Sequence, residues 1–155
     1  MTRQFVNGKI VLDEAVGFIV YRAHQTMRQE MYRRFAKLGI EMTPEQWALL
    51  VRLWERDGRT QNDLSEVTLR DKHTISRMLD GMVERGWVER RPDPSDGRGK
   101  LIFLTQAGLA LEAQLVPLAE SQVRTMLRGI PAEDLQVTLR TLRKMSENSG
   151  SDPNV

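Results

Sequence analysis

The residues best suited to chemistry lie close together between Asp71 and Arg77. Five of them carry side chains that can donate hydrogen bonds: Lys72, His73, Thr74, Ser76 and Arg77. Such side chains can donate to base edges and to phosphate oxygens. The positions recur at helical spacing, with His73, Ser76, Arg77 and Asp80 on one face and Ile75, Met78, Leu79 and Met82 on the other. The pattern predicts an amphipathic helix with a donor-rich polar face. An ordinary surface helix shows the same pattern, so this helix alone does not establish a contact with nucleic acid.

A second group of charged residues lies in and beside the Pro- and Gly-rich segment 92–99. Its basic members are Arg90, Arg91, Arg98 and Lys100, and its acidic members are Asp93 and Asp96. Arg98 follows Asp96 by two positions, so the carboxylate can orient the guanidinium through a charge-assisted hydrogen bond. An oriented arginine on a protruding tip can enter a narrow, negatively charged minor groove. The alternative interpretation is a solvated loop of mixed charge.

The elements that position these groups are predicted from apolar spacing and from helix-start signals. Thr43-Pro44-Glu45-Gln46 combines a capping residue, a proline at the first helical position and a capping box. Asp71 stands where it can cap the donor-rich helix. Extended runs at 87–91 and 100–104 predict a β-hairpin with a long, charged tip. The predicted helices span 11–38, 43–57, 60–67, 71–85, 105–128 and 131–145.

Further local signals refine these elements. The helix that begins at Thr43 is predicted to turn Trp47, Leu50, Val51 and Trp54 toward the interior. Pro117 predicts a kink in the helix that follows the hairpin. The first nine residues and the polar tail from Ser146 onward are predicted to fray.

Composition excludes several classes of protein. The chain has 155 residues, a size that suits one domain, and it contains no Cys and only two His. Disulfide scaffolds, Cys-ligated zinc and thiol chemistry are therefore excluded, and we expect no metal and no cofactor. No apolar run is long enough to span a membrane, and the N-terminus lacks the pattern of a secretory signal, so we expect a cytoplasmic location. The net charge of +2 is too small to identify nucleic acid as a partner.

Four helices, a hairpin and two helices follow one another in the order of a winged helix-turn-helix. Four motifs accompany this order: DKHTISR at 71–77, RGWVER at 85–90, DPSDGR at 93–98 and LTQAG at 104–108. With these motifs, the segment from Asp63 to Gly108 resembles the MarR family of transcriptional regulators. Two positions depart from the family pattern. Leu69 stands where the family often has Gly, and Gly81 interrupts the recognition helix.

The resemblance implies a fold class that is mainly α with a small β-hairpin, formed by a single domain over 1–155. A winged helix-turn-helix lobe is expected at 43–108, with dimerisation helices at 11–38 and 109–147. The long apolar stripes of the first and last helices favour a homodimer independently, because a chain this small has few interior surfaces to cover them. Packing of these stripes within one chain is the alternative.

A further implication is a contact with double-stranded DNA at a pseudo-palindromic operator. The expected DNA contacts come from the third helix, the recognition helix and the wing: Thr60, Gln61, Lys72, His73, Thr74, Ser76, Arg77, Arg90, Asp96, Arg98 and Lys100. Within this set we expect His73, Ser76 or Arg77 to face bases, and Lys72 and Thr74 to lie nearer phosphates.

Family members are often released from DNA by small anionic aromatic or phenolic ligands. The candidate contacts for such an effector are His24, Arg28 and Trp47. We expect Trp47 to serve as a core residue more than as a ligand contact, and His24 to be an ordinary boundary histidine. The Met residues fall on apolar stripes, which favours core packing over a redox sensor.

The leading hypothesis is a sequence-specific DNA-binding transcriptional regulator that acts as a repressor released by a small aromatic ligand. A winged-helix module for protein–protein contact and a DNA-binding activator without an effector are the alternatives. An enzyme acting on nucleic acid is the third class, but no paired carboxylate site, phosphate-binding Gly loop or metal cluster supports it. We therefore expect no enzymatic activity.

Overall fold

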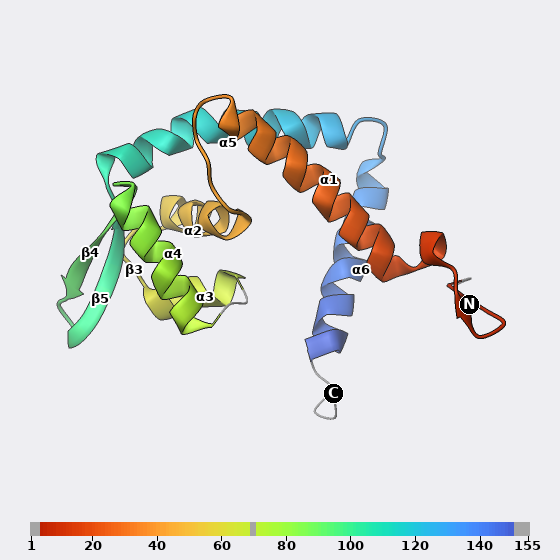
Figure 1. Cartoon of the computed structure of the whole chain (residues 1–155), viewed down its shortest axis with the longest axis horizontal. Coiled ribbons are helices and arrows are strands. Elements are labelled where there is room, and N and C mark those ends of the chain that lie inside the picture. Colours follow the sequence, from red (N-terminus) through yellow and green to blue (C-terminus); the bar gives the residue numbers. More distant parts are fainter. Residues whose placement is uncertain (1–3, 69–70, 151–155) are drawn as a thin grey trace. The chain divides into compact units, whose positions relative to one another are not determined.

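The computed structural model describes residues 4–68 and 71–150, which are mostly helical with small antiparallel sheets (Figure 1). In chain order the elements are β1 (Phe5–Val6), β2 (Lys9–Ile10), a 3₁₀ helix (Leu12–Glu14), α1 (Val16–Ala36), α2 (Pro44–Glu55), β3 (Arg59–Thr60), α3 (Gln61–Thr68), α4 (Lys72–Glu84), β4 (Val88–Asp93), β5 (Asp96–Leu104), α5 (Gln106–Met126) and α6 (Ala132–Gly150). They form two compact units, one up to Gln122 and one from Val123 onward. The expected fold class, a winged helix-turn-helix with further N- and C-terminal helices, is confirmed.

Local capping explains where α2 and α4 begin. The Thr43 hydroxyl accepts the backbone N–H of Gln46 at 3.2 Å, and the Gln46 side chain accepts the backbone N–H of Thr43 at 3.0 Å. This reciprocal pair satisfies two donors that a helix start leaves open, and Pro44 needs no donor at its position. At α4, Asp71 caps the helix by accepting the backbone N–H of Thr74 at 2.9 Å. Both predicted helix starts are confirmed.

The core of the first unit lies where α2, α3 and α4 meet the three-stranded sheet. Its fully buried side chains include Phe35, Leu49, Leu50, Leu53, Leu64, Ile75, Leu79, Met82 and Ile102. The predicted inward face of α2 is wrong in part, because Leu49 and Leu53 are buried while Val51 is only half-buried. Trp47 and Trp54 pack at the edge of this core. Other elements pack against more of the α2 surface than the predicted apolar face covers. The predicted face alone therefore does not identify which residues of α2 are most buried.

The two strands of the wing are longer than the sequence predicts. The expected strands at 87–91 and 100–104 extend to Val88–Asp93 and Asp96–Leu104, so only Pro94 and Ser95 connect them. The predicted long loop at the tip is therefore wrong, because Pro92, Asp93 and Asp96 pair across the β4–β5 ladder and residues 97–99 belong to β5. An irregularity between Pro92 and Asp93 absorbs the proline, which has no N–H to donate. A third strand, β3, pairs with β5 through Arg59 and Thr60, and two residues are too few to give a periodic signal.

The N-terminal region differs from the predicted single helix. The described residues of the segment expected to fray form a β1–β2 hairpin, in which Asn7 and Gly8 take positive φ values of 50° and 74°. Asn-Gly is a favoured pair for such a two-residue turn. A 3₁₀ turn follows, so α1 begins at Val16 and not near residue 11. Gly39, with φ of +72°, follows the end of α1 as expected.

Of the two C-terminal helices, α5 is slightly shorter than its predicted span and α6 is longer. α5 runs through Pro117 to Met126, and within the first unit Gln122 of this helix donates to the Met27 carbonyl of α1 at 2.6 Å. α6 ends at Gly150, so residues 146–150 are helical where fraying was expected, and 151–155 lie outside the described residues. Among the described helices, none combines the length and apolarity needed to cross a bilayer.

Candidate nucleic-acid interface

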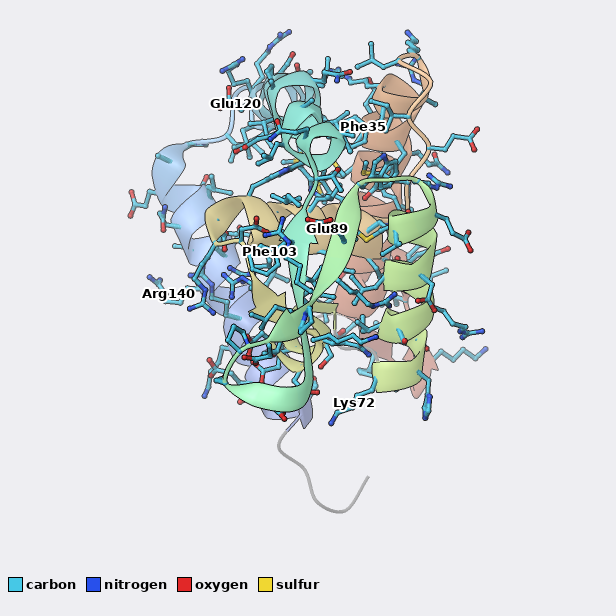
Figure 2. All side chains as sticks on the ribbon, turned by 90° about the vertical axis from the view of Figure 1, so that its left-hand side faces the viewer. Phe35, Lys72, Glu89, Phe103, Glu120 and Arg140 are labelled. Carbon is cyan, nitrogen blue, oxygen red and sulfur yellow. The ribbon has the colours of Figure 1, made fainter. Side chains whose placement is uncertain are left out.

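The faces of α4 are sorted as its sequence predicts. Ile75, Leu79 and Met82 are fully buried. The opposite face carries exposed His73 and Arg77. Figure 2 shows Lys72 projecting from the first turn of the same helix. The described start of α4 therefore presents two cations and one imidazole to solvent. The buried side chains of its opposite face hold the helix against the core.

The first turn of α4 is held by Asp71 and Thr74. Besides accepting the Thr74 backbone N–H, the Asp71 carboxylate accepts the Thr74 hydroxyl at 2.8 Å. These bonds from the Thr74 backbone and hydroxyl lower the pKa of Asp71 below its usual range. The Thr74 proton is thus used within the helix cap, and its oxygen retains lone pairs for acceptance. Among the predicted contact residues, Thr74 has this additional structural duty.

The start of α3 is joined to the start of α4. Thr60 caps α3, because its hydroxyl accepts the Asp63 backbone N–H at 3.1 Å while its own N–H donates to the Asp63 carboxylate at 3.4 Å. The Gln61 side chain donates to the backbone carbonyl of Lys72 at 3.1 Å. Thr60 and Gln61 are therefore brought beside α4, as a shared interface requires. Leu69, the departure noted in the turn between these helices, lies outside the described residues.

On the wing, alternate residues of β4 point to opposite faces. Arg90 pairs in register with buried Ile102, which places it on the side that faces α4. Its guanidinium lies 2.7 Å from the Asp80 carboxylate and donates to the Ser76 carbonyl at 3.3 Å. Arg90 is thus bound to α4, and its pairing with Asp80 was not predicted from the sequence.

Arg91 lies on the other face of the wing. Its guanidinium pairs with Glu89 and stands 4.3 Å from the centroid of the Phe103 ring. Both Glu89 and Phe103 are labelled on the wing in Figure 2. The two neighbouring arginines therefore differ in their partners, because only Arg90 contacts α4.

The wing tip carries the remaining predicted contacts. Asp93 accepts the Ser95 hydroxyl at 2.7 Å and the Ser95 backbone N–H at 2.8 Å, and these bonds lower the pKa of Asp93. Asp96 and Lys100 are exposed on β5. The Arg98 side chain, and with it the expected Asp96–Arg98 pair, lies outside the described part of the structure. In both views the tip and the start of α4 lie toward the same end of the first unit (Figures 1 and 2).

The base of the wing contains a close contact that sequence reasoning had not singled out. A Cβ atom on Gly108 would lie 2.0 Å from the carbonyl oxygen of Trp87, so only glycine fits there. The Trp54 indole N–H donates to the Gly108 carbonyl at 3.0 Å, and the Thr105 N–H donates to the Trp87 carbonyl at 3.1 Å. The start of β4, the start of α5 and the core helix α2 are thereby tied together. The glycine of the LTQAG motif is the signal that could have revealed this junction.

The candidate effector residues occupy two environments. His24 and Arg28 are exposed on α1, and the Arg28 guanidinium stands 5.9 Å from the centroid of the Tyr32 ring. Burial raises the pKa of Tyr32 well above its usual value. Trp47 packs against Phe35 and Trp54, with ring centroids 5.2 Å and 5.5 Å apart. In the described residues, no group of three or more His, Asp or Glu is arranged to hold a metal ion.

Comparison with known proteins gives a consistent result. A model described as the MarR family matches residues 40–99. The transcriptional regulator HosA of Escherichia coli is 30% identical over 127 residues, which cover 80% of this chain and 94% of HosA. The transcriptional repressor NicR of Pseudomonas putida is 28% identical over 140 residues, covering 88% of this chain and 87% of NicR. A crystal structure of mutant MarR from E. coli complexed with operator DNA is 27% identical and aligns with a TM-score of 0.76, covering 84% of this chain and 92% of that one.

Proposed function

Because the chain belongs to the MarR family of transcriptional regulators, we propose that it binds a pseudo-palindromic DNA operator as a homodimer and acts as a repressor. The observation that supports this most directly is the pairing of two features at one end of the first unit. The donor-rich start of α4 and the tip of the β4–β5 wing lie toward the same end of the first unit, as major-groove and adjacent minor-groove contacts require.

The proposed roles follow from where each residue lies in the first unit. His73 and Arg77 are exposed on the outer face of α4 and are assigned to base edges together with Ser76. Lys72, Thr60 and Gln61 lie at the two helix starts and are assigned to the phosphate backbone. Thr74, whose hydroxyl and backbone N–H both donate to Asp71, is assigned to the cap of α4. Arg98 and Lys100 are assigned to the minor groove beside each half-site, with Asp96 orienting Arg98. Arg90 is treated separately below, because its guanidinium is already bound.

The proposed homodimer is supported by apolar side chains that remain exposed. Within the first unit, Leu12, Val16 and Ile19 are exposed by 53%, 39% and 51%. Within the second unit, Val137, Leu139 and Leu142 are exposed in the same way. Contiguous exposed apolar surface typically marks a protein interface. A two-fold dimer would also place two copies of α4 about 34–36 Å apart, one turn of DNA.

Release by a small anionic aromatic ligand is the final part of the proposal. Arg28 offers a cation beside the Tyr32 ring on α1, and His24 lies one helical turn before it. Trp47 is assigned to core packing. Repression is proposed by analogy with NicR, which is named as a repressor.

The test uses the full chain and DNA from the region upstream of its own coding sequence. Gel retardation at several salt concentrations should show tighter binding to this fragment than to a shuffled fragment of equal length, with affinity falling steeply as salt rises. Footprinting with and without benzoate-type acids then maps the operator and tests release. Equal affinity for shuffled and native fragments would contradict the proposed function.

A further inference from the structure

We propose that Arg90 and Asp80 form a positioning pair that fixes the wing against the recognition helix. In this role Arg90 influences DNA binding through α4 and does not touch phosphate. The inference rests on the proposed DNA-binding function and adds a specificity-determining contact to it.

The first support is the direction of the Arg90 side chain. β4 alternates, so Val88 and Arg90 share the face that looks toward the core, and Val88 is fully buried. Only 23% of the Arg90 side chain is exposed. A phosphate contact needs an extended guanidinium at the surface, whereas this one lies under the wing.

The second support is the way Arg90 grips α4. One terminal nitrogen lies 2.7 Å from the Asp80 carboxylate, and the other donates to the Ser76 carbonyl at 3.3 Å. Ser76 and Asp80 are four residues apart, so the guanidinium spans one turn of the helix. Because the guanidinium is planar and rigid, these two contacts limit both the rotation and the distance of the wing strand relative to α4.

The third support is the charge of Asp80. It lies on the polar face of α4, seven residues after His73, and seven residues of helix span about 10 Å. That distance is close to one Debye length at 0.1 M salt, so an unpaired carboxylate there would repel a bound phosphate backbone. Pairing with Arg90 neutralises the Asp80 charge and so removes this repulsion. The pair therefore explains how an acidic residue can occupy the polar face of α4.

The neighbouring Arg91 supplies a matched control on the same strand. Its guanidinium pairs with Glu89 and stacks on Phe103, on the face away from α4. Arg91→Gln therefore removes the same charge from the wing without touching the recognition helix.

The experiment measures affinity for an operator and for a shuffled duplex at several salt concentrations, by fluorescence anisotropy. The variants are Arg90→Gln, Asp80→Asn, the double variant, Arg90→Lys and Arg91→Gln. Arg90→Gln and Asp80→Asn should each lower the ratio of operator to shuffled affinity about tenfold, within the range for loss of one base contact. The double variant should lose no more than either single variant, because both remove one coupling.

Further readouts separate positioning from a direct contact. Arg90→Lys keeps the charge but not the planar fork, so it should recover only part of the ratio. The salt dependence of the double variant, which leaves no unpaired Asp80 charge, should match that of the wild type, and Arg91→Gln should keep the wild-type ratio. A thermal melt checks that each variant is folded at the assay temperature. If Arg90→Gln is unfolded, the affinities of Asp80→Asn and Arg90→Lys are compared with that of the wild type instead.

Three outcomes would overturn the inference. One is a salt slope for the double variant that falls by about 0.9, which marks a lost phosphate contact of Arg90. Another is tighter binding of Asp80→Asn to every duplex, which would make Asp80 purely repulsive. The last is additive loss in the double variant. If the wild type shows no preference for any duplex, the proposed function itself fails, and that result is distinct from a wild type that binds while its variants are unchanged.

Discussion

The carbonyl oxygen of Trp87 lies 2.0 Å from the position that a Cβ atom on Gly108 would occupy. Trp87 immediately precedes the first strand of the wing, and Gly108 lies in the first turn of α5. The Gly108 carbonyl also accepts the Trp54 indole N–H, so the wing base is clamped to the core through these residues. The contact explains why this position of the LTQAG motif holds a residue without a side chain.

Gly108→Ala should therefore destabilise the fold. The added methyl group must push the Trp87 backbone aside, and overpacking of this kind costs about 3 kcal/mol of unfolding free energy. Urea unfolding followed by circular dichroism measures the change. Gly81→Ala is the matched control, because a Cβ there meets nothing within 4 Å and the residue lies inside α4. It should raise the free energy of unfolding by about 0.5–1 kcal/mol. A Gly108→Ala variant as stable as wild type would contradict the contact.

The cap of α4 should depend on pH. The pKa of Asp71 is lowered by its bonds from the Thr74 backbone and hydroxyl, so the cap contributes fully at neutral pH and is lost as pH falls through that lowered pKa. Amide hydrogen exchange should show that the protection of the Thr74 N–H stays constant down to pH ~4 and weakens below that pH. Asp71→Asn keeps a capping oxygen but cannot titrate, so its Thr74 protection should not change with pH. The same acid-induced loss in Asp71→Asn would rule out Asp71 as the titrating group.

Arg77 and Lys72 should differ in what they contribute to DNA binding. Arg77→Ala should cost about 1–3 kcal/mol on the operator and relax specificity at one base pair, because we assign Arg77 to a base edge. Lys72→Ala should weaken binding to all duplexes alike and reduce the salt slope by about 1, as loss of a phosphate contact does. Binding to an operator library with single base changes distinguishes the two patterns. Uniform weakening by Arg77→Ala would reassign Arg77 to the backbone.

Arg98 of the wing should contact the minor groove in the sequences that flank each half-site of the operator. Arg98→Ala should weaken binding mainly to operators with A·T-rich flanks, whose narrow minor grooves attract arginine. Asp96→Asn should weaken binding less, because it only loosens the orientation of Arg98. Arg98→Lys should not restore full affinity, since lysine lacks the planar fork. Titrations on A·T-rich and G·C-rich flanks test all three variants. Wild-type binding by all of them on every flank would leave specificity to α4 alone.

The apolar surface of α1 should decide the oligomeric state. Ile19→Lys places a charge within the exposed apolar stripe and should shift the protein from dimer to monomer at micromolar concentration. Leu38→Lys is the control, because Leu38 has the same exposed fraction of 51% but lies beyond the end of α1. Sedimentation equilibrium measures both. A wild-type protein that sediments as a stable monomer at this concentration would contradict the proposed homodimer.

The amino-acid sequence by itself determined the order of the helices and the wing, the starts of α2 and α4, and the two faces of α4. These features depend on residues within a few positions of one another. Thr43 and Gln46 are three residues apart, as are Asp71 and Thr74, and the faces of α4 follow from 3.6 residues per turn. Local spacing is sufficient for such features because the interacting groups are neighbours on one turn.

Only the tertiary structure decided which partners these elements have. Apolar spacing in α1 predicted an apolar stripe but not which part of the stripe other elements would bury. In the structure Phe35 of this stripe is buried and Ile19 is exposed. The Arg90–Asp80 pair joins a strand to a helix, and the close approach of Gly108 to Trp87 joins a helix to the base of the wing. In each case the residues come together through the packing of separate elements. Contacts of that kind depend on the three-dimensional path of the chain, which residue spacing within one element does not contain.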